Sequence, residues 1–229
     1  MNGRGFWIWR LDKCENGNID RLIAKCKLAD ISFVAVKCGN SGSQWKQFNK
    51  QLVDKFHSNN IKIYGWSYDI PSKINEQVKV VKSIEEMGAD GYIIDAEIEW
   101  DKNQKAKAIE YMKELRRNTN FIIADAPWDV PQFHTGFPFA EFSVDVRSPQ
   151  AYHVAHGISV EKTLERYKKS YGCNISSQVP SASVWTKCSF DDIEYFEKYI
   201  KNEGCSGYIM WAWDSCTSEV WRYLLNSKF

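Results

Sequence analysis

Several features that would place this 229-residue chain in a familiar class are missing from its sequence. The formal net charge is only +1, from 30 Lys and Arg against 29 Asp and Glu, so bulk charge gives no reason to expect a nucleic-acid or membrane partner. No apolar run approaches the roughly 20 residues of a membrane helix, and no charged-then-apolar leader begins the chain. We therefore expect a soluble cytoplasmic protein without a signal peptide, which would reach a substrate outside the cytoplasm only after release.

Cysteine and histidine also form no recognisable pattern. The cysteines are odd in number and lack a C-x-x-C pair, which argues against a disulfide framework and a zinc knuckle and predicts buried free thiols. No H-E-x-x-H motif, G-x-S-x-G elbow, phosphate-binding glycine loop or dinucleotide fingerprint is found. We expect no metal and no cofactor, although carboxylates alone could hold a divalent cation. The residues concerned are Cys14, Cys26, Cys38, Cys173, Cys188, Cys205, Cys216, His57, His134, His153 and His156.

Short β-type runs alternate with amphipathic helical segments along the chain. This pattern is typical of a parallel sheet with crossover helices. Eight runs are counted, the number that closes a (β/α)8 barrel of the TIM type, here as a single domain over residues 1–229; a doubly wound open sheet is the alternative. The expected strands are Phe6–Leu11, Phe33–Cys38, Ile61–Tyr68, Tyr92–Ile98, Phe121–Ala126, Phe142–Val146, Gln178–Trp185 and Tyr208–Trp213.

Most of the crossovers show a helical period. Apolar residues recur at three- and four-residue spacing over residues 45–56 and 193–200, and Ser189 with Asp192 resembles a capping box. Gly88, Gly172 and Gly204 fall where helices should end. Prolines and a glycine interrupt residues 131–138, so we expect an irregular crossover between strands five and six.

The segment from residue 91 to residue 100 carries the clearest chemical signal. It reads Gly-Tyr-Ile-Ile-Asp-Ala-Glu-Ile-Glu-Trp and places Asp95, Glu97 and Glu99 at every second position. Side chains alternate faces along a strand, so a strand here would aim all three carboxylates at one place, at a cost in repulsion and desolvation. A solvated acidic face on an edge strand is the structural alternative. Because perturbed acids gather at active sites, we interpret the three as catalytic residues.

Polar and aromatic residues also follow most of the other expected strands. In a barrel the C-terminal strand ends meet at one mouth, where barrel enzymes build their sites. Carboxylates, amides and rings around one mouth suit a neutral polyhydroxylated ligand. The substrate-binding residues predicted on this basis are Asp12, Asp69, Asp125, Trp128, Asp145, Gln150, Tyr152, Trp211, Trp213 and Asp214.

Many of these residues also have a structural interpretation. Asp12, Asp69 and Asp214 stand where Asp often begins a turn or caps a helix. Arg147 could neutralise a neighbouring acid. Lys37, on the second strand, is compatible with a Schiff-base lysine, but a salt bridge to the acidic centre is the favoured interpretation. Most of the aromatic rings would fill the core, and at least one is expected to stack on substrate.

The strand that ends Ile-Ile-Asp95-Ala-Glu97, fourth among eight, resembles the D-x-E motif of the lysozyme-type glycoside hydrolases of family 25. These are muramidases common among phage endolysins and bacterial autolysins. The resemblance implies cleavage of the β-1,4 bond between N-acetylmuramic acid and N-acetylglucosamine in peptidoglycan, without a cofactor. It also implies Glu97 as the general acid with Asp95 as its partner, and it matches Asp12 and Asp214 to acidic residues after the first and last strands. The segment from Pro149 to Tyr152 looks more like other sugar-cleaving barrels.

The acidic residues can supply the groups that glycoside hydrolysis requires. A protonated carboxylic acid must serve the leaving oxygen, and a second carboxylate must attack or stabilise the oxocarbenium-like centre. Like charge and desolvation should raise the pKa of Glu97 between Asp95 and Glu99. Same-face neighbours on a strand lie about 6.6 Å apart, a spacing that leaves retention and inversion both open. On an N-acetylated substrate, Asp95 could instead orient the acetamide as an internal nucleophile.

The resemblance, together with the acidic residues, thus implies a peptidoglycan-cleaving glycoside hydrolase of the lysozyme type that acts on the cell wall after its release. We expect it to be a monomer. Its partner would be a polysaccharide, with neither nucleic acid nor membrane involved. Two alternatives remain open: a barrel glycosidase that acts on another N-acetylhexosamine glycan, and a catalytically inactive glycan-binding barrel.

Overall fold

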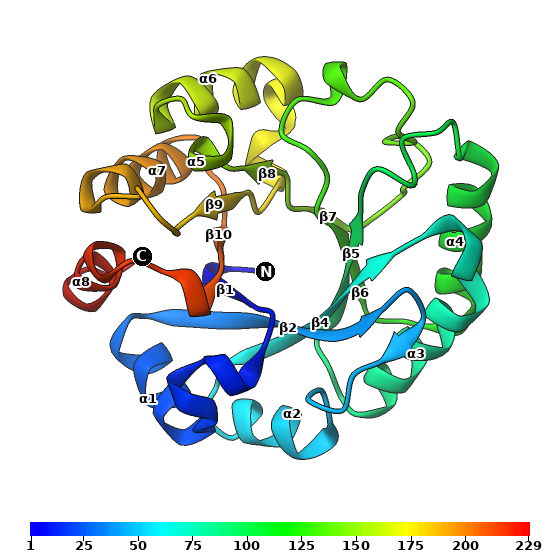
Figure 1. The fold of residues 1–229 in the computed structure, drawn as a ribbon, viewed down its shortest axis with the longest axis horizontal. Coiled ribbons are helices and arrows are strands. Elements are labelled where there is room, and N and C mark those ends of the chain that lie inside the picture. The colour runs from blue at the N-terminus through cyan, green and yellow to red at the C-terminus, as the bar shows by residue number, and fades with distance from the viewer.

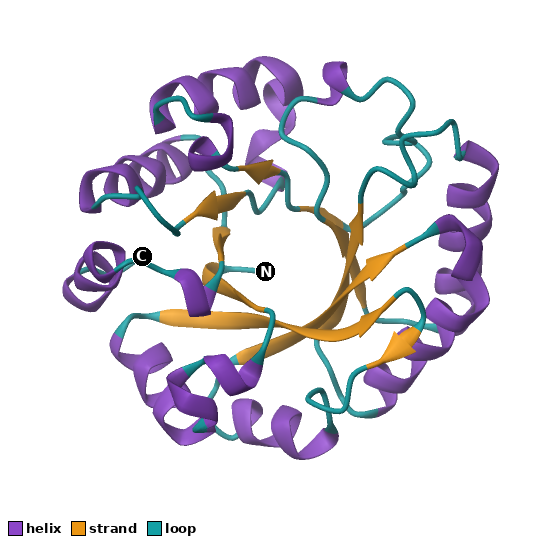
Figure 2. Ribbon diagram, in the orientation of Figure 1, coloured by secondary structure: helices purple, strands orange, loops and turns teal.

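The structure of residues 1–229 is a computed structural model that describes the whole chain apart from the side chain of Cys173. Its strands form one sheet that curls into a ring, and the helices pack around the outside (Figures 1 and 2). Neighbouring strands of the ring pair in parallel, and the short β3 pairs antiparallel with β2. The predicted barrel of alternating strands and helices is confirmed.

The strands of the sheet are β1 (Gly3–Ile8), β2 (Ile31–Asn40), β3 (Ser43–Gln44), β4 (Lys62–Asp69), β5 (Gly91–Ala96), β6 (Ile122–Asp125), β7 (Val146–Arg147), β8 (Gln150–Ala151), β9 (Ser181–Ser183) and β10 (Gly207–Trp211). The α-helices are α1 (Ile19–Leu28), α2 (Lys50–His57), α3 (Ile74–Glu86), α4 (Lys105–Asn118), α5 (His153–His156), α6 (Val160–Tyr171), α7 (Phe190–Asn202) and α8 (Ser218–Asn226). None of the described helices combines the length and apolar character needed to cross a membrane.

One extended segment completes the ring in two halves. Its first half, β7, pairs with β6, and its second half, β8, pairs with β9. Between them, the Val179 N–H donates to the Arg147 carbonyl at 2.9 Å and the Ser181 N–H donates to the Pro149 carbonyl at 2.8 Å. β7 and β8 therefore share one strand position, which gives the eight positions expected for this barrel.

The sixth strand is the one predicted at the wrong place. It was expected at Phe142–Val146, but pairing begins only at Val146. The ring of Phe142 is buried and packs edge-on against Trp100 at 5.0 Å. The apolar residue that suggested a strand here is therefore buried by contacts of a loop. Upstream, the chain between β6 and β7 contains one 3₁₀ turn, Pro131–Phe133, and no α-helix, as predicted for this crossover.

The helix signals read from the sequence correspond to observed helix ends. The Ser189 hydroxyl accepts from the Asp192 N–H and the Asp192 carboxylate accepts from the Ser189 N–H, so the capping box at the start of α7 is confirmed. Gly88, Gly172 and Gly204 follow α3, α6 and α7 with positive φ angles of 91°, 60° and 76°, a conformation that glycine adopts without strain.

Two hydrophobic clusters divide the core. The smaller one fills the inside of the barrel, and the larger one lies between the barrel and its helices. Along β1, Trp7 points inward whereas Phe6 and Ile8 point toward the helices, as strand alternation requires. The inner cluster consists of Trp7, Phe33, Ala35, Tyr64, Trp66, Ile93, Ala124, Ala126, Val179, Ile209 and Ala212.

The six described cysteines are free thiols, as predicted. Five of them are buried and Cys216 is half-buried, while the side chain of Cys173 lies outside the described part of the chain.

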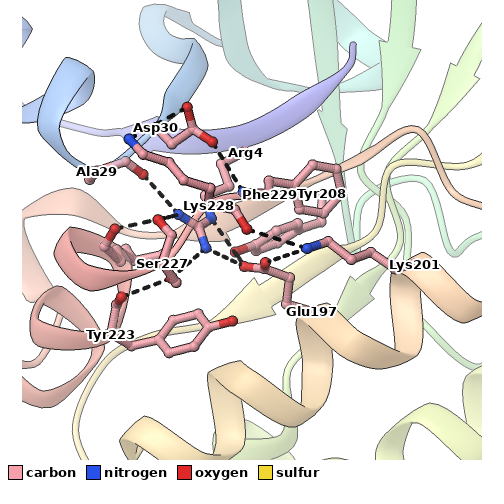
Figure 3. A network of polar contacts seen from close by, with 11 residues as sticks. Arg4, Ala29, Asp30, Glu197, Lys201, Tyr208, Tyr223, Ser227, Lys228 and Phe229 are labelled. Atoms are coloured by element: carbon pink, nitrogen blue, oxygen red, sulfur yellow. Dashed lines mark hydrogen bonds and ion pairs between the residues drawn. The ribbon is translucent and has the colours of Figure 1, made fainter.

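A buried ion pair joins β1 to α7 where the ring closes. Arg4 on β1 is fully buried and donates to Glu197 of α7 at 2.7 and 3.0 Å (Figure 3). Its guanidinium also donates to the carbonyls of Ala29 at 3.1 Å and Ser227 at 2.9 Å, and Glu197 accepts from the Tyr208 hydroxyl at 2.9 Å. These bonds tie β1 and β10 to the helices behind them.

Replacing Glu197 with Gln should lower the free energy of unfolding by about 3–5 kcal/mol, because the Arg4 charge would stay buried without its carboxylate. Urea unfolding followed by circular dichroism measures the change. Glu194→Gln on the same helix is the matched control, since its ion pair with Lys198 is exposed and worth about 0.5 kcal/mol. Equal effects of the two substitutions would contradict the role given to Arg4.

Candidate active site

A cavity opens at the C-terminal ends of the strands. Its volume is about 180 Å³, and its polar lining comes from Asp95 at the end of β5, Glu97 just after it, Gln150 on β8 and Tyr152 after β8. Residues distant in the sequence thus meet at one place, as the barrel geometry predicts. Trp7, Ala126 and Trp211 complete the wall.

The chain turns immediately after the second of the three acids. β5 ends at Ala96, and the Trp100 N–H donates to the Glu97 carbonyl at 2.9 Å. Glu99 therefore leaves the strand direction, accepts a short hydrogen bond from the Tyr68 hydroxyl and lines a neighbouring surface groove. The expectation that all three carboxylates point to one place is wrong for Glu99. The turn after Glu97 is held in place by the buried Trp100, whose indole N–H donates to the Asp69 carbonyl at 2.7 Å, and this turn directs Glu99 away from the cavity.

Burial dominates the electrostatics of the two acids that remain in the cavity. It raises the pKa of Asp95 well above the ordinary range for aspartate, and the neighbouring charge of Glu97 adds to the effect. Burial also raises the pKa of Glu97; hydrogen bonding to Gln150 opposes this rise and the charge of Glu99 supports it. The pair therefore favours a protonated form at a pH where exposed carboxylates are ionised.

Lys37 provides positive charge near this pair without touching it. Its ammonium lies over the rings of Trp66 at 4.5 Å, Trp45 at 5.0 Å and Trp9 at 5.5 Å. The predicted salt bridge to the acidic centre is wrong, because among the described side chains this ammonium has aromatic partners and no ion pair. Its burial lowers the pKa of Lys37, and the charge of Asp95 opposes that effect. Cation–π contacts stabilise such a desolvated ammonium.

Asp69 and Asp125 follow their strands as predicted but lie outside the lining of the cavity. Asp69 is fully buried and accepts from the hydroxyls of Tyr92 at 2.6 Å and Tyr111 at 2.8 Å. Asp125 pairs with Arg147 at 3.2 Å, so this arginine does neutralise an acid. Burial raises the pKa of both carboxyls to about 7, against these opposing contacts. Their contacts place them in the wall behind the cavity.

Four other predicted substrate-binding residues also lie away from the cavity. Asp12 is exposed and bonded to Arg10 at 3.0 Å, and Asp214 is exposed. Trp213 is buried against Phe6, with ring centres 5.1 Å apart. Trp128 stacks on the His134 ring at 3.7 Å, within the loop after β6.

A fifth predicted residue, Asp145, lies away from the cavity because it precedes its strand and does not follow it. The strand begins one residue later, at Val146, so Asp145 lies at the N-terminal end of the barrel and not at the mouth. There its carboxylate accepts from Arg116 at 2.8 Å and from the Ile123 N–H at 2.8 Å.

Trp7 lines the cavity although it was not predicted as a site residue. The rings of Trp7 and Trp211, which line the cavity, and of Trp66 pack edge to face with ring centres 5.5 to 5.8 Å apart. Trp7 also donates its indole N–H to Ser181 at 3.1 Å. Its inward position in the β1 alternation is the signal that could have identified it.

Comparison with known proteins supports the fold and finds no relative by sequence. No protein-family model and no curated protein matches the chain. Among solved structures, the spore cortex-lytic enzyme SleL of Bacillus cereus superposes with a TM-score of 0.70 at 8% identity, covering 98% of this chain and 74% of that one.

Two plant proteins superpose over nearly their whole lengths. A class V chitinase from Nicotiana tobaccum, in complex with NAG4, gives a TM-score of 0.62 at 10% identity and covers 99% of this chain and 98% of its own. The xylanase and α-amylase inhibitor protein XAIP-II from Scadoxus multiflorus gives 0.65 at 12% identity and covers 100% and 99%. The chain therefore has the TIM-barrel fold of these structures, which include enzymes and an inhibitor protein.

Proposed function

We propose that this protein hydrolyses a β-1,4-linked glycan that contains N-acetylglucosamine, with Glu97 as the general acid. The observation that carries the proposal is the meeting of Glu97 and Asp95, two acids with raised pKa values, with Tyr152 in one small cavity at the mouth of the barrel. A protonated carboxyl in a partly desolvated cavity is the group that glycoside hydrolysis needs at the leaving oxygen.

The cavity favours a reaction in which the substrate supplies its own nucleophile. Such substrate assistance operates in glycoside hydrolase families 18 and 20. Glu97 donates its proton to the glycosidic oxygen while the acetamide oxygen of the sugar attacks the anomeric carbon, so the glycosidic bond breaks as a cyclic oxazolinium forms. The Glu97 carboxylate then removes a proton from water, which opens the ring with retention of configuration. Asp95 and the Tyr152 hydroxyl are the groups in the cavity that can hydrogen-bond the acetamide and hold it for attack.

Peptidoglycan is the substrate that we propose within this class. Two findings support it: the D-x-E resemblance of Asp95 and Glu97 to the family 25 lysozymes, and the likeness of the fold to a spore cortex-lytic enzyme. Chitin is the second candidate, supported by the likeness to a chitinase. The specific bond between N-acetylmuramic acid and N-acetylglucosamine is part of the same proposal.

A glycan-binding protein without catalytic activity is the candidate from a different functional class. It is favoured by the full-length likeness to an inhibitor protein. In that case the acids would contribute to binding, and removing the proton of Glu97 would affect affinity and not turnover.

Glu97→Gln should reduce the release of reducing ends by about 10²- to 10⁴-fold, because the amide keeps the shape but cannot donate the proton. Purified peptidoglycan and chitin oligomers are the two substrates to compare, and binding of the oligomers is measured in parallel by calorimetry. Binding should stay within a few-fold of the wild type.

The matched control is Glu99→Gln, which should cost less than about tenfold because Glu99 lies outside the cavity. Loss in the Glu99 variant with activity retained in the Glu97 variant would show that the wrong acid has been assigned. Binding with no turnover of either substrate by the wild type would favour the glycan-binding candidate.

The pH dependence of kcat/KM should show activity falling as pH rises through the raised pKa of Glu97, since only the protonated acid donates. The Lys37 charge lowers the pKa of both Glu97 and Asp95. Lys37→Met should therefore move this alkaline limb to higher pH. The exposed Lys46→Met is the control that should leave the limb in place. A limb that shifts to lower pH in the Lys37 variant would contradict the assignment.

A further inference from the structure

Three potential metal ligands lie together behind the wall of the cavity. His153 follows Tyr152 and begins α5, Cys188 lies in the loop after β9, and Asp192 lies in the first turn of α7. Their ligand atoms are all within 4.8 Å of one another, and the His153 Nε2 is 3.8 Å from the Asp192 carboxylate. His153 and Cys188 are buried and Asp192 is half-buried.

The imidazole of His153 has one nitrogen satisfied and one without a partner. Nδ1 hydrogen-bonds the Ser183 hydroxyl at 2.7 Å, and that hydroxyl also accepts from the Val154 N–H at 3.3 Å. Nε2 is buried and has no hydrogen-bond partner among the described residues, although the side chain is only 7% exposed. A buried nitrogen without a hydrogen-bond partner lowers the stability of the fold. A metal-binding histidine usually has its ring held by a hydrogen bond from the nitrogen that does not bind the metal, as Nδ1 is held here.

The other two ligands are also suitable for a metal. The Asp192 carboxylate is held by the Ser189 N–H at 2.9 Å and the Ser189 hydroxyl at 2.7 Å, so it is oriented before any ion arrives. The Cys188 sulfur has only a weak contact, 3.8 Å to the Ser189 carbonyl.

We propose that His153, Cys188 and Asp192 bind one zinc ion. A nitrogen, a sulfur and an oxygen are the donors that zinc uses, and three protein ligands leave the fourth tetrahedral position to water. Bonds of about 2.0–2.3 Å place neighbouring tetrahedral ligands roughly 3.3–3.6 Å apart, so atoms that now lie within 4.8 Å of one another need to approach by at most about 1.5 Å. Binding converts the Cys188 thiol to a zinc-bound thiolate and releases one proton to solvent.

The ion would connect two parts of the cavity wall. His153 lies one residue after Tyr152, and Cys188 lies three residues after Trp185. The rings of Tyr152 and Trp185 pack edge to face, with centres 5.2 Å apart. Zinc would hold the start of α5 against the start of α7 and so support the position of Tyr152. This role does not depend on the glycan that the cavity accepts.

The test is zinc binding by the full chain after treatment with a chelator. Competition with a chromogenic chelator should show one tightly bound zinc per chain. His153→Ala and Cys188→Ser should each weaken binding by roughly 100-fold or more, because each removes one of three ligands. Cys205→Ser is the matched control, since Cys205 is another buried thiol that donates to the Ile175 carbonyl far from the cluster.

Cobalt gives a second measurement that needs no variant to fold. Co²⁺ bound by the wild type should show thiolate-to-cobalt charge-transfer absorption in the near ultraviolet, and zinc should remove it. Absence of this band, absence of tight zinc binding, or binding that Cys188→Ser leaves unchanged would each overturn the proposal. Circular dichroism of each variant separates loss of the site from loss of the fold.

Discussion

The pairing of β1 with β10 is the constraint on which the rest of the molecule depends. Gly3 aligns with Gly207 in this pairing, so residues from the two ends of the chain form one parallel ladder. Asp95, Gln150 and Trp211 come from different parts of the ring, and they share a cavity only because the ring is closed. The Arg4–Glu197 ion pair lies behind this ladder, where a charge without its partner would be strongly unfavourable.

The fold was largely predictable from the sequence because buried parallel strands leave a strong pattern. Short apolar runs between amphipathic helices identify the strands and their order, and helix caps such as Ser189 mark the boundaries. The sixth strand was misplaced because the apolar Phe142 was read as part of a strand, whereas it packs against Trp100 within a loop. Periodicity alone does not separate these two cases.

The site was predictable only in part, since a turn or a tertiary contact determines where a side chain finally points. Asp95 and Glu97 follow from the strand, whereas the turn at Trp100 sends Glu99 to Tyr68. The cluster of His153, Cys188 and Asp192 leaves no short motif, since its members meet only through the packing of α5 against β9 and of α7 behind the sheet. Lys37 was predicted to form a salt bridge with the acidic centre, but the aromatic rings that surround it come from three separate segments.

The β1–β10 pairing also bears on how the chain is made. During translation β1 emerges before the other strands of the barrel, and β10, one of its two neighbours, emerges after all of them. Until then β1 is an unprotected sheet edge that carries the large apolar side chains of Phe6 and Ile8. Contacts of such high sequence separation form slowly, so the nascent barrel spends its synthesis as an open sheet, and chaperone demand should concentrate on that stage.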